Sequence, residues 1–207
     1  MLIRPAKIQD AEALASLIQL AAGDTLQALL TVPHASISEF LRYALGRSQG
    51  QFGYGNHWVV CDTNPPHTNI WATGCTWHTN MQADFQLATL HTLLTYFGHE
   101  KALHIVQNNA LLEDLVKAPL PHQLSVGHFA VAPNMQTKGV GRRLLDHFVE
   151  LAKQTDKQQL CLDVAQNNHN AIAFYQHYGF IMQSTSAPRD ASASKGFSPH
   201  CHMVFSI

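Results

Sequence analysis

HFAVAPNMQTKGVGRRLLDHF, residues 128–148, carries more structural information than any other part of this sequence. It opens inside an apolar segment that starts at about 123 and predicts a β-strand ended by Pro133. The turn NMQTKGVG follows, and a helical pattern then covers about 139–154, with its apolar residues on a single stripe. That stripe consists of Val140, Leu144, Leu145, Phe148, Val149 and Ala152. The stretch therefore predicts a strand, a glycine loop and a helix in succession.

The glycine loop has the features of an anion-binding site. The first turn of a helix leaves backbone N–H groups unpaired, and the helix dipole places partial positive charge there. Gly139 and Gly141 carry no side chains, so a phosphate can approach the backbone, and Arg142 and Arg143 add charge. The loop is not a P-loop, because the pattern G-x-x-x-x-G-K-[ST] is absent, and it is not a dinucleotide fingerprint, because Leu144 stands at the third glycine position. A helix cap without any ligand is the alternative interpretation of the loop alone.

A second pattern follows the predicted strand at 160–164. A short amphipathic helix at about 168–178 ends at Gly179 and contains NHNA, residues 168–171, and FYQHYGF, residues 174–180. Together with QTKGVG, residues 136–141, these segments resemble in order and spacing the two motifs of the GNAT superfamily of N-acetyltransferases. The family patterns are Q/R-x-x-G-x-G/A and N-x-x-A followed by Y-x-x-x-G-F. The resemblance covers about 122–181.

The resemblance implies a fold and a cosubstrate. The fold is α/β, a mixed and mainly antiparallel sheet of about six or seven strands flanked by helices, with the pyrophosphate loop between a central strand and the following helix. The cosubstrate is acetyl-CoA, whose pantetheine arm lies like an added strand between two splayed strands. The resemblance assigns cofactor contacts to Phe129, Val131, Gln136, Thr137, Lys138, Gly139, Val140, Gly141, Arg142, Asn168 and Tyr175. Of these, the Val131 N–H would face the thioester carbonyl and stabilise its oxyanion.

Two residues are candidates for proton transfer. Tyr175 matches the family tyrosine that protonates the leaving thiolate, and a phenol with a pKa near 10 holds its proton at neutral pH. Its alternative role is that of a core aromatic, and Tyr178, one turn further on, is a second candidate. His128, on the predicted strand, is a candidate general base for the attacking amine, since histidine titrates near neutrality. A hydrogen-bonded sheet histidine is the alternative for His128.

We therefore expect direct transfer of an acetyl group from acetyl-CoA to a primary amine of a small molecule or peptide. A module that binds acyl-CoA without catalysis, as a sensor, stays open, as does transfer of a longer acyl group. An NAD-dependent oxidoreductase is disfavoured by the missing third glycine. The acceptor is expected to contact about 23–56 and a helical region at about 80–121, which matches no known pattern.

The bulk composition limits partners and location. The 207 residues fit a single domain over 1–207, and 13 basic against 14 acidic side chains give a net charge of -1. That balance gives no basic excess to attract nucleic acid or an anionic membrane. No apolar run is long enough for a transmembrane helix, no secretory signal is visible, and the four cysteines form no C-x-x-C pair. These features predict a cytoplasmic protein, and a homodimer stays open.

The 14 histidines raise the question of a metal. His99, Glu100 and His104 resemble H-E-x-x-H but have one residue too many, which places the two rings on different sides of a helix. His200 and His202 share one face of a predicted strand, but no third ligand is identifiable. The sequence therefore predicts no metal site.

Two further helices are predicted with specific ends. Asp10 caps a helix over about 11–22 that Gly23 stops, and a later helical run spans Leu111 to Val116 with Asn108 or Asn109 as its cap.

Overall fold

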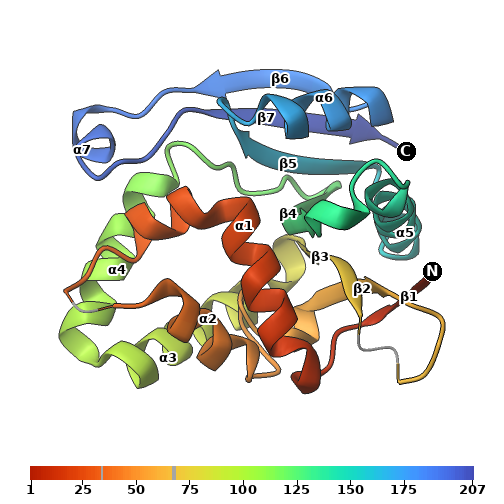
Figure 1. Cartoon of the computed structure of the whole chain (residues 1–207). Helices are drawn as coiled ribbons and strands as arrows, with labels where there is room; N and C mark the ends of the chain where they lie inside the picture. The colour runs from red at the N-terminus through yellow and green to blue at the C-terminus, as the bar shows by residue number, and fades with distance from the viewer. Residues whose placement is uncertain (34, 67–68) are drawn as a thin grey trace.

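A single sheet of seven strands organises the chain, of which a computed structural model describes residues 1–33, 35–66 and 69–207. The strands are β1 (Leu2–Pro5), β2 (His57–Cys61), β3 (Ile70–Trp77), β4 (Gln123–Val131), β5 (Gln159–Ala165), β6 (Ile181–Ser186) and β7 (His200–Ser206). Their order is β1-β2-β3-β4-β5-β7-β6 (Figure 1). Only β4 and β5 pair in parallel among these neighbours, so the predicted mixed, mainly antiparallel sheet is confirmed.

Four helices from the first half of the chain cover one face of the sheet. They are α1 (Ala11–Leu29), α2 (Ile37–Leu45), α3 (Gln82–Phe97) and α4 (His99–Leu112), which lie together in Figure 1. Their buried side chains form one hydrophobic cluster with Val59 of β2, and Phe40, Leu41 and Ile105 are among its most deeply buried members. Burial of this apolar surface stabilises the N-terminal half of the fold.

The helices α5 (Val140–Gln154) and α6 (His169–Tyr178) pack against the other face. The stripe of α5 is buried as predicted, apart from the partly buried Val149, and Leu144 and Phe148 belong to the same cluster as Val60 and Ala72 of the sheet. A short helix, α7 (Asp190–Ala193), precedes β7. None of the helices in the described part of the chain is long and apolar enough to cross a membrane.

Two predicted helix boundaries are wrong. Gly23 does not end the first helix, which continues to Leu29 through a local break at Ala22 (φ −132°, ψ 17°), because Leu26 and Leu29 bury their side chains in the core. A single glycine costs only about 1 kcal/mol in a helix, and burial of two leucines outweighs that cost.

The expected helix at Leu111 to Val116 is also wrong. The structure has α4 instead, which begins after Gly98 and ends at Leu112. Asn108 is not a cap; its side chain is buried and its Nδ2 donates to the Leu29 carbonyl, 3.1 Å away.

Candidate active site

The parallel strands β4 and β5 separate after a short paired section. In this section Gln123 pairs with Gln159, Leu124 with Leu160 and Ser125 with Cys161. Beyond it, β4 continues to Val131 and β5 to Ala165. Beyond this section the described pairing of β4 is with β3 alone. The facing edges of two central strands thus diverge, and such edges can bind an extended chain through backbone hydrogen bonds.

A β-bulge lies where β4 leaves β5. Thr73 pairs with Ala130 and Cys75 with Gly127, so Gly74 on β3 faces both His128 and Phe129 on β4. His128 has a φ of 49°, in the left-handed region. A bulge bends the strand that carries it and redirects its side chains. In this case the bend accompanies the separation of the two strands.

The bulge also needs a glycine on the neighbouring strand. A Cβ at position 74 would lie 2.9 Å from Cε2 of Phe148 and 3.2 Å from Cδ2 of Phe129. Gly74 therefore lets the α5 aromatic ring approach the sheet directly beneath the bulge.

The loop after β4 leads to an uncapped helix N-terminus. Thr137 (φ 61°) and Gly139 (φ 76°) adopt left-handed backbone conformations, and α5 then begins at Val140. No side chain caps α5, and its first turn contains no acidic residue. The loop from Gln136 to Gly139 is exposed, so the first N–H groups of α5 are available to an anion.

Gly141 joins the three elements of the site. A Cβ there would lie 3.1 Å from Cζ of Phe174 on α6 and 3.3 Å from Cγ2 of Val131 at the end of β4. The second glycine of the loop therefore serves close packing, which holds the start of α5 against the open end of β4.

The Val131 N–H points into the gap between β4 and β5. The next N–H along the chain, that of Ala132, donates to the Trp71 carbonyl at 2.8 Å, toward β3. Successive N–H groups of an extended strand point to opposite edges. That of Val131 therefore points to the β5 side, where the two strands have separated.

Tyr175 lies on the α5 and α6 face of the sheet. Its ring is buried and lies 6.0 Å from that of Phe129 and 5.5 Å from that of Phe180, centroid to centroid. Its hydroxyl makes no hydrogen bond to the described residues, and burial raises its pKa above the usual value. The phenol is therefore protonated at neutral pH.

His128 lies on the opposite face of the sheet, in contact with the α1 to α4 cluster. Its ring stacks on that of Phe52, with 5.1 Å between centroids, and its Nδ1 is 3.0 Å from Nε2 of His57 on β2. Burial lowers the pKa of His128 to about 3 and that of His57 to about 4. Both imidazoles are therefore neutral at physiological pH, and the expectation that His128 titrates near neutrality is wrong.

Two further residues beside His128, His57 and Cys75, carry no signal in the sequence. These two residues face each other across β2 and β3, and together with His128 they place three nitrogen and sulfur atoms within 4.8 Å of one another. Burial keeps the Cys75 thiol protonated by raising its pKa. His57 and His128 are 71 residues apart in sequence, so only the strand register brings them together.

Asn168 and Tyr178 have structural contacts in this fold. The Asn168 side chain caps α6 by accepting from the Ala171 N–H at 3.1 Å. The Tyr178 hydroxyl donates to Oδ1 of Asp146 on α5 at 2.8 Å, and Arg142 lies over its ring. Tyr178 therefore ties α6 to α5, and Tyr175 is the tyrosine whose hydroxyl is free of such a contact among the described residues.

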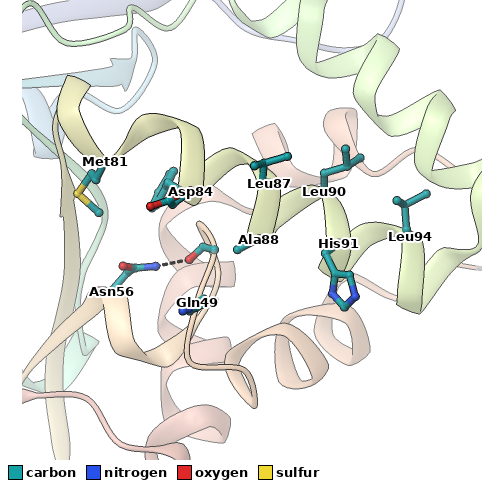
Figure 2. A pocket seen from close by; sticks show the side chains of 11 residues that line it. Gln49, Asn56, Met81, Asp84, Leu87, Ala88, Leu90, His91 and Leu94 are labelled. Carbon is teal, nitrogen blue, oxygen red and sulfur yellow. Dashed lines mark hydrogen bonds between the residues drawn. The ribbon is translucent and has the colours of Figure 1, made fainter.

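A cavity of about 740 Å³ opens beside α3 (Figure 2). It lies between α3 and the loop before β2, which the Gln51 N–H ties to Thr89 Oγ1 at 2.7 Å. Leucine side chains of α3 form much of its lining, and Asp84 is its charged residue. Within that loop the Asn56 amide donates to the Gly50 carbonyl (Figure 2).

Comparison with known proteins agrees with this geometry. Residues 102–180 match the acetyltransferase (GNAT) family. A ribosomal protein bS18-alanine N-acetyltransferase of Escherichia coli (strain K12) is 29% identical over 76 residues, which are 37% of this chain and 51% of the relative. The corresponding Salmonella typhimurium protein is 27% identical over 90 residues, 42% of this chain and 61% of the relative. The match thus spans about half the length of these relatives.

Solved structures resemble the whole chain. An N-acetyltransferase from Staphylococcus aureus Mu50 has a TM-score of 0.68 at 15% identity and covers 99% of this chain and 100% of its own. A ribosomal-protein-alanine N-acetyltransferase from Brucella melitensis has a TM-score of 0.55 at 15% identity, with 100% of both chains covered. At these identities the likeness concerns the fold. Residues 102–180 thus resemble the GNAT acetyltransferases in sequence, and the whole chain shares the fold of these solved acetyltransferase structures.

Proposed function

We propose that the protein is an N-acetyltransferase that moves the acetyl group of acetyl-CoA directly to a primary amine. The observation that carries this proposal is the opening between β4 and β5, which ends at the uncapped N-terminus of α5. An extended pantetheine arm fits along the open strand edge, and the pyrophosphate fits the helix terminus. Both sites lie on consecutive segments of one chain, so one ligand can occupy them together.

The loop backbone would bind the pyrophosphate. The segment from Gln136 to Arg142 runs from an exposed loop into the first turn of α5, where the helix dipole favours an anion. The side chains of Lys138 and Arg142 are exposed beside them and add positive charge. Phe129 and the Asn168 side chain would contact the cofactor arm from β4 and from the start of α6.

The acetyl group would lie at the end of β4. The amine nitrogen attacks the thioester carbon there, and the Val131 N–H stabilises the negative charge that develops on the carbonyl oxygen. The C–S bond then breaks, the Tyr175 hydroxyl gives its proton to the thiolate, and His128 takes the proton that the amine loses.

The two proton-transfer groups lie on opposite faces of the sheet, which supports this division of roles. Tyr175 packs with the α5 and α6 cluster, and His128 packs against Phe52 of the other cluster. A thioester held in the opening between β4 and β5 separates the two side chains. The acid thus reaches the thiol from one face, and the base reaches the incoming amine from the other.

The acceptor would enter through the cavity beside α3. Phe85 in its wall stacks on Trp77 at 5.8 Å between centroids, and Trp77 covers Gly127, the residue before His128. Apolar lining with the Asp84 carboxylate favours an amine carried on an apolar group. The relatives' acceptor, an alanine of ribosomal protein bS18, belongs in the acceptor screen for that reason.

The reaction is tested by thiol release. Purified protein, acetyl-CoA and a panel of amines and peptides are mixed, and free CoA is followed with a thiol reagent. Amine-dependent CoA release, with an acetylated product of the expected mass, supports the proposal. Saturable acetyl-CoA binding with no turnover on any amine would favour the non-catalytic sensor instead, and faster release from longer thioesters would favour a longer acyl group.

The setting of this reaction is also proposed. We place it in the cytoplasm, because all four cysteines are buried and free and acetyl-CoA is available there. The chain from 1 to 207 would act as one acetyltransferase domain, because strands from both ends of the sequence join the same sheet.

A further inference from the structure

We propose that His57 is a positioning residue for acetyl transfer: it holds His128 in the tautomer whose Nδ1 is protonated and whose Nε2 faces the incoming amine as a free base. This inference rests on the proposed function, in which His128 takes a proton from the amine. It concerns a residue that touches neither substrate and acts only through His128.

The tautomer follows from a chain of hydrogen bonds that starts at a carbonyl. His57 Nδ1 lies 2.8 Å from the Gly53 carbonyl oxygen, which can only accept, so this nitrogen carries the His57 proton. His57 is neutral, and its Nε2 therefore has a lone pair and no proton. His128 Nδ1 lies 3.0 Å from that lone pair and must donate to it. The remaining nitrogen of His128, Nε2, is left with its lone pair.

The start of the chain is held firmly in place. Gly53 lies in a tight turn, in which its N–H donates to Gly50 at 3.0 Å and its carbonyl also accepts from the Asn56 N–H at 3.2 Å. A Cβ at position 53 would lie 2.3 Å from the Gln49 carbonyl oxygen, so the turn requires glycine there. His57 itself is fully buried in β2. The carbonyl that orients His57 therefore has little freedom to move.

The end of the chain is accessible. Nε2 of His128 makes no hydrogen bond to the described residues, and it is not among their enclosed unpartnered atoms. Phe52 covers one ring face, and the bulge fixes the backbone of His128 at its positive φ. Without His57, Nδ1 would be as free as Nε2, and the proton could reside on either nitrogen.

Cys75 is the other titratable group against this pair, and it defines the rival arrangement. Its thiol and the two imidazole nitrogens lie close enough to hold a metal ion. A bound ion would take the lone pair of His128 Nδ1 and leave the proton on Nε2. The two arrangements therefore predict opposite tautomers of His128.

The first experiment is a ¹⁵N NMR spectrum of the imidazole nitrogens in the purified protein. We expect His128 to show a protonated Nδ1 and an unprotonated Nε2, and metal analysis to find no stoichiometric ion. A protonated Nε2, or one equivalent of metal whose removal by a chelator abolishes activity, would overturn the proposal. This readout needs no turnover, so it is independent of the proposed function.

The second experiment separates positioning from structure by two substitutions at one site. His57→Phe keeps a ring but removes the acceptor for His128, and we expect kcat to fall about 10- to 100-fold with KM for acetyl-CoA unchanged. His57→Gln offers an amide oxygen near the former Nε2, and most of the lost kcat should return. Equal kcat values for the Phe and wild-type proteins would overturn the proposal. Absence of turnover in the wild-type protein would instead contradict the proposed function.

Discussion

The hydrogen-bonded pair of His57 and His128 should make the protein lose stability as the pH falls below about 6.5. Burial lowers the pKa of His57 to about 4 and that of His128 to about 3, whereas both titrate near 6.5 in the unfolded chain. Between pH 6.5 and 4 the unfolded state therefore binds protons that the native state does not. Stability is complete above the unfolded pKa and decreases as the solution is acidified toward the native pKa values.

The size of the effect follows from these pKa differences. At pH 5 protonation stabilises each histidine of the unfolded chain by about 2 kcal/mol, whereas the native side chains stay neutral. The pair then costs about 4 kcal/mol relative to pH 7.5, a large part of the 5–15 kcal/mol that typically separates folded from unfolded states. Cys75 adds nothing to this change, because its buried thiol is protonated throughout this range.

Urea unfolding followed by tryptophan fluorescence at pH 7.5 and pH 5.0 measures the effect. His57→Gln and His128→Gln should each remove about 2 kcal/mol of the pH dependence, whatever their own stability at pH 7.5. His99→Gln, which changes an exposed histidine at the start of α4, is the matched control and should keep the wild-type difference. If the His57 and His128 variants and the control show the same pH dependence, the pair is not neutral in the native state and the reasoning fails.

Three substitutions test the rest of the site. Tyr175→Phe keeps the packed ring, so we expect the fold and the CoA affinity to persist while kcat falls about 10²- to 10⁴-fold. An unchanged kcat would remove Tyr175 from the mechanism. Gly139→Ala adds a methyl group in open space but at a φ of 76°, so it should cost about 1–2 kcal/mol in thermal denaturation and weaken CoA binding in calorimetry. Gly141→Ala meets Phe174 and Val131 at 3.1 and 3.3 Å, so it should cost about 1–3 kcal/mol, and a neutral result would mean that α5 moves freely against β4.

The strand, loop and helix around the glycine motif were predictable because their signals are local. Pro133 follows the apolar strand, and the stripe of α5 has the helical period, so each element is specified by its own residues. The motif at Asn168 to Phe180 fixes the second half of the site in the same way. The positions of Val131, Phe129 and Tyr175 around the opening follow from these elements, and their roles stay predictions.

The features that escaped prediction depend on contacts distant in sequence. His57 and Cys75 reach His128 only because β2, β3 and β4 pair in one register and β4 contains a bulge. Gly23 looked like a helix stop, but the buried leucines beyond it extend α1. No local pattern in the sequence encodes either result.

The most direct test of the central claim is binding of acetyl-CoA at the opening between β4 and β5. Calorimetric titrations with acetyl-CoA, CoA and NAD compare the wild-type protein with the Gly139→Ala variant. A thermal-shift assay confirms binding, because a ligand of the native state raises its melting temperature. We predict that acetyl-CoA and CoA bind the wild-type protein, that NAD does not, and that the variant binds both CoA ligands more weakly. No binding of acetyl-CoA at millimolar concentration, or equal affinity for NAD, would contradict the account and leave the glycine loop as a helix cap.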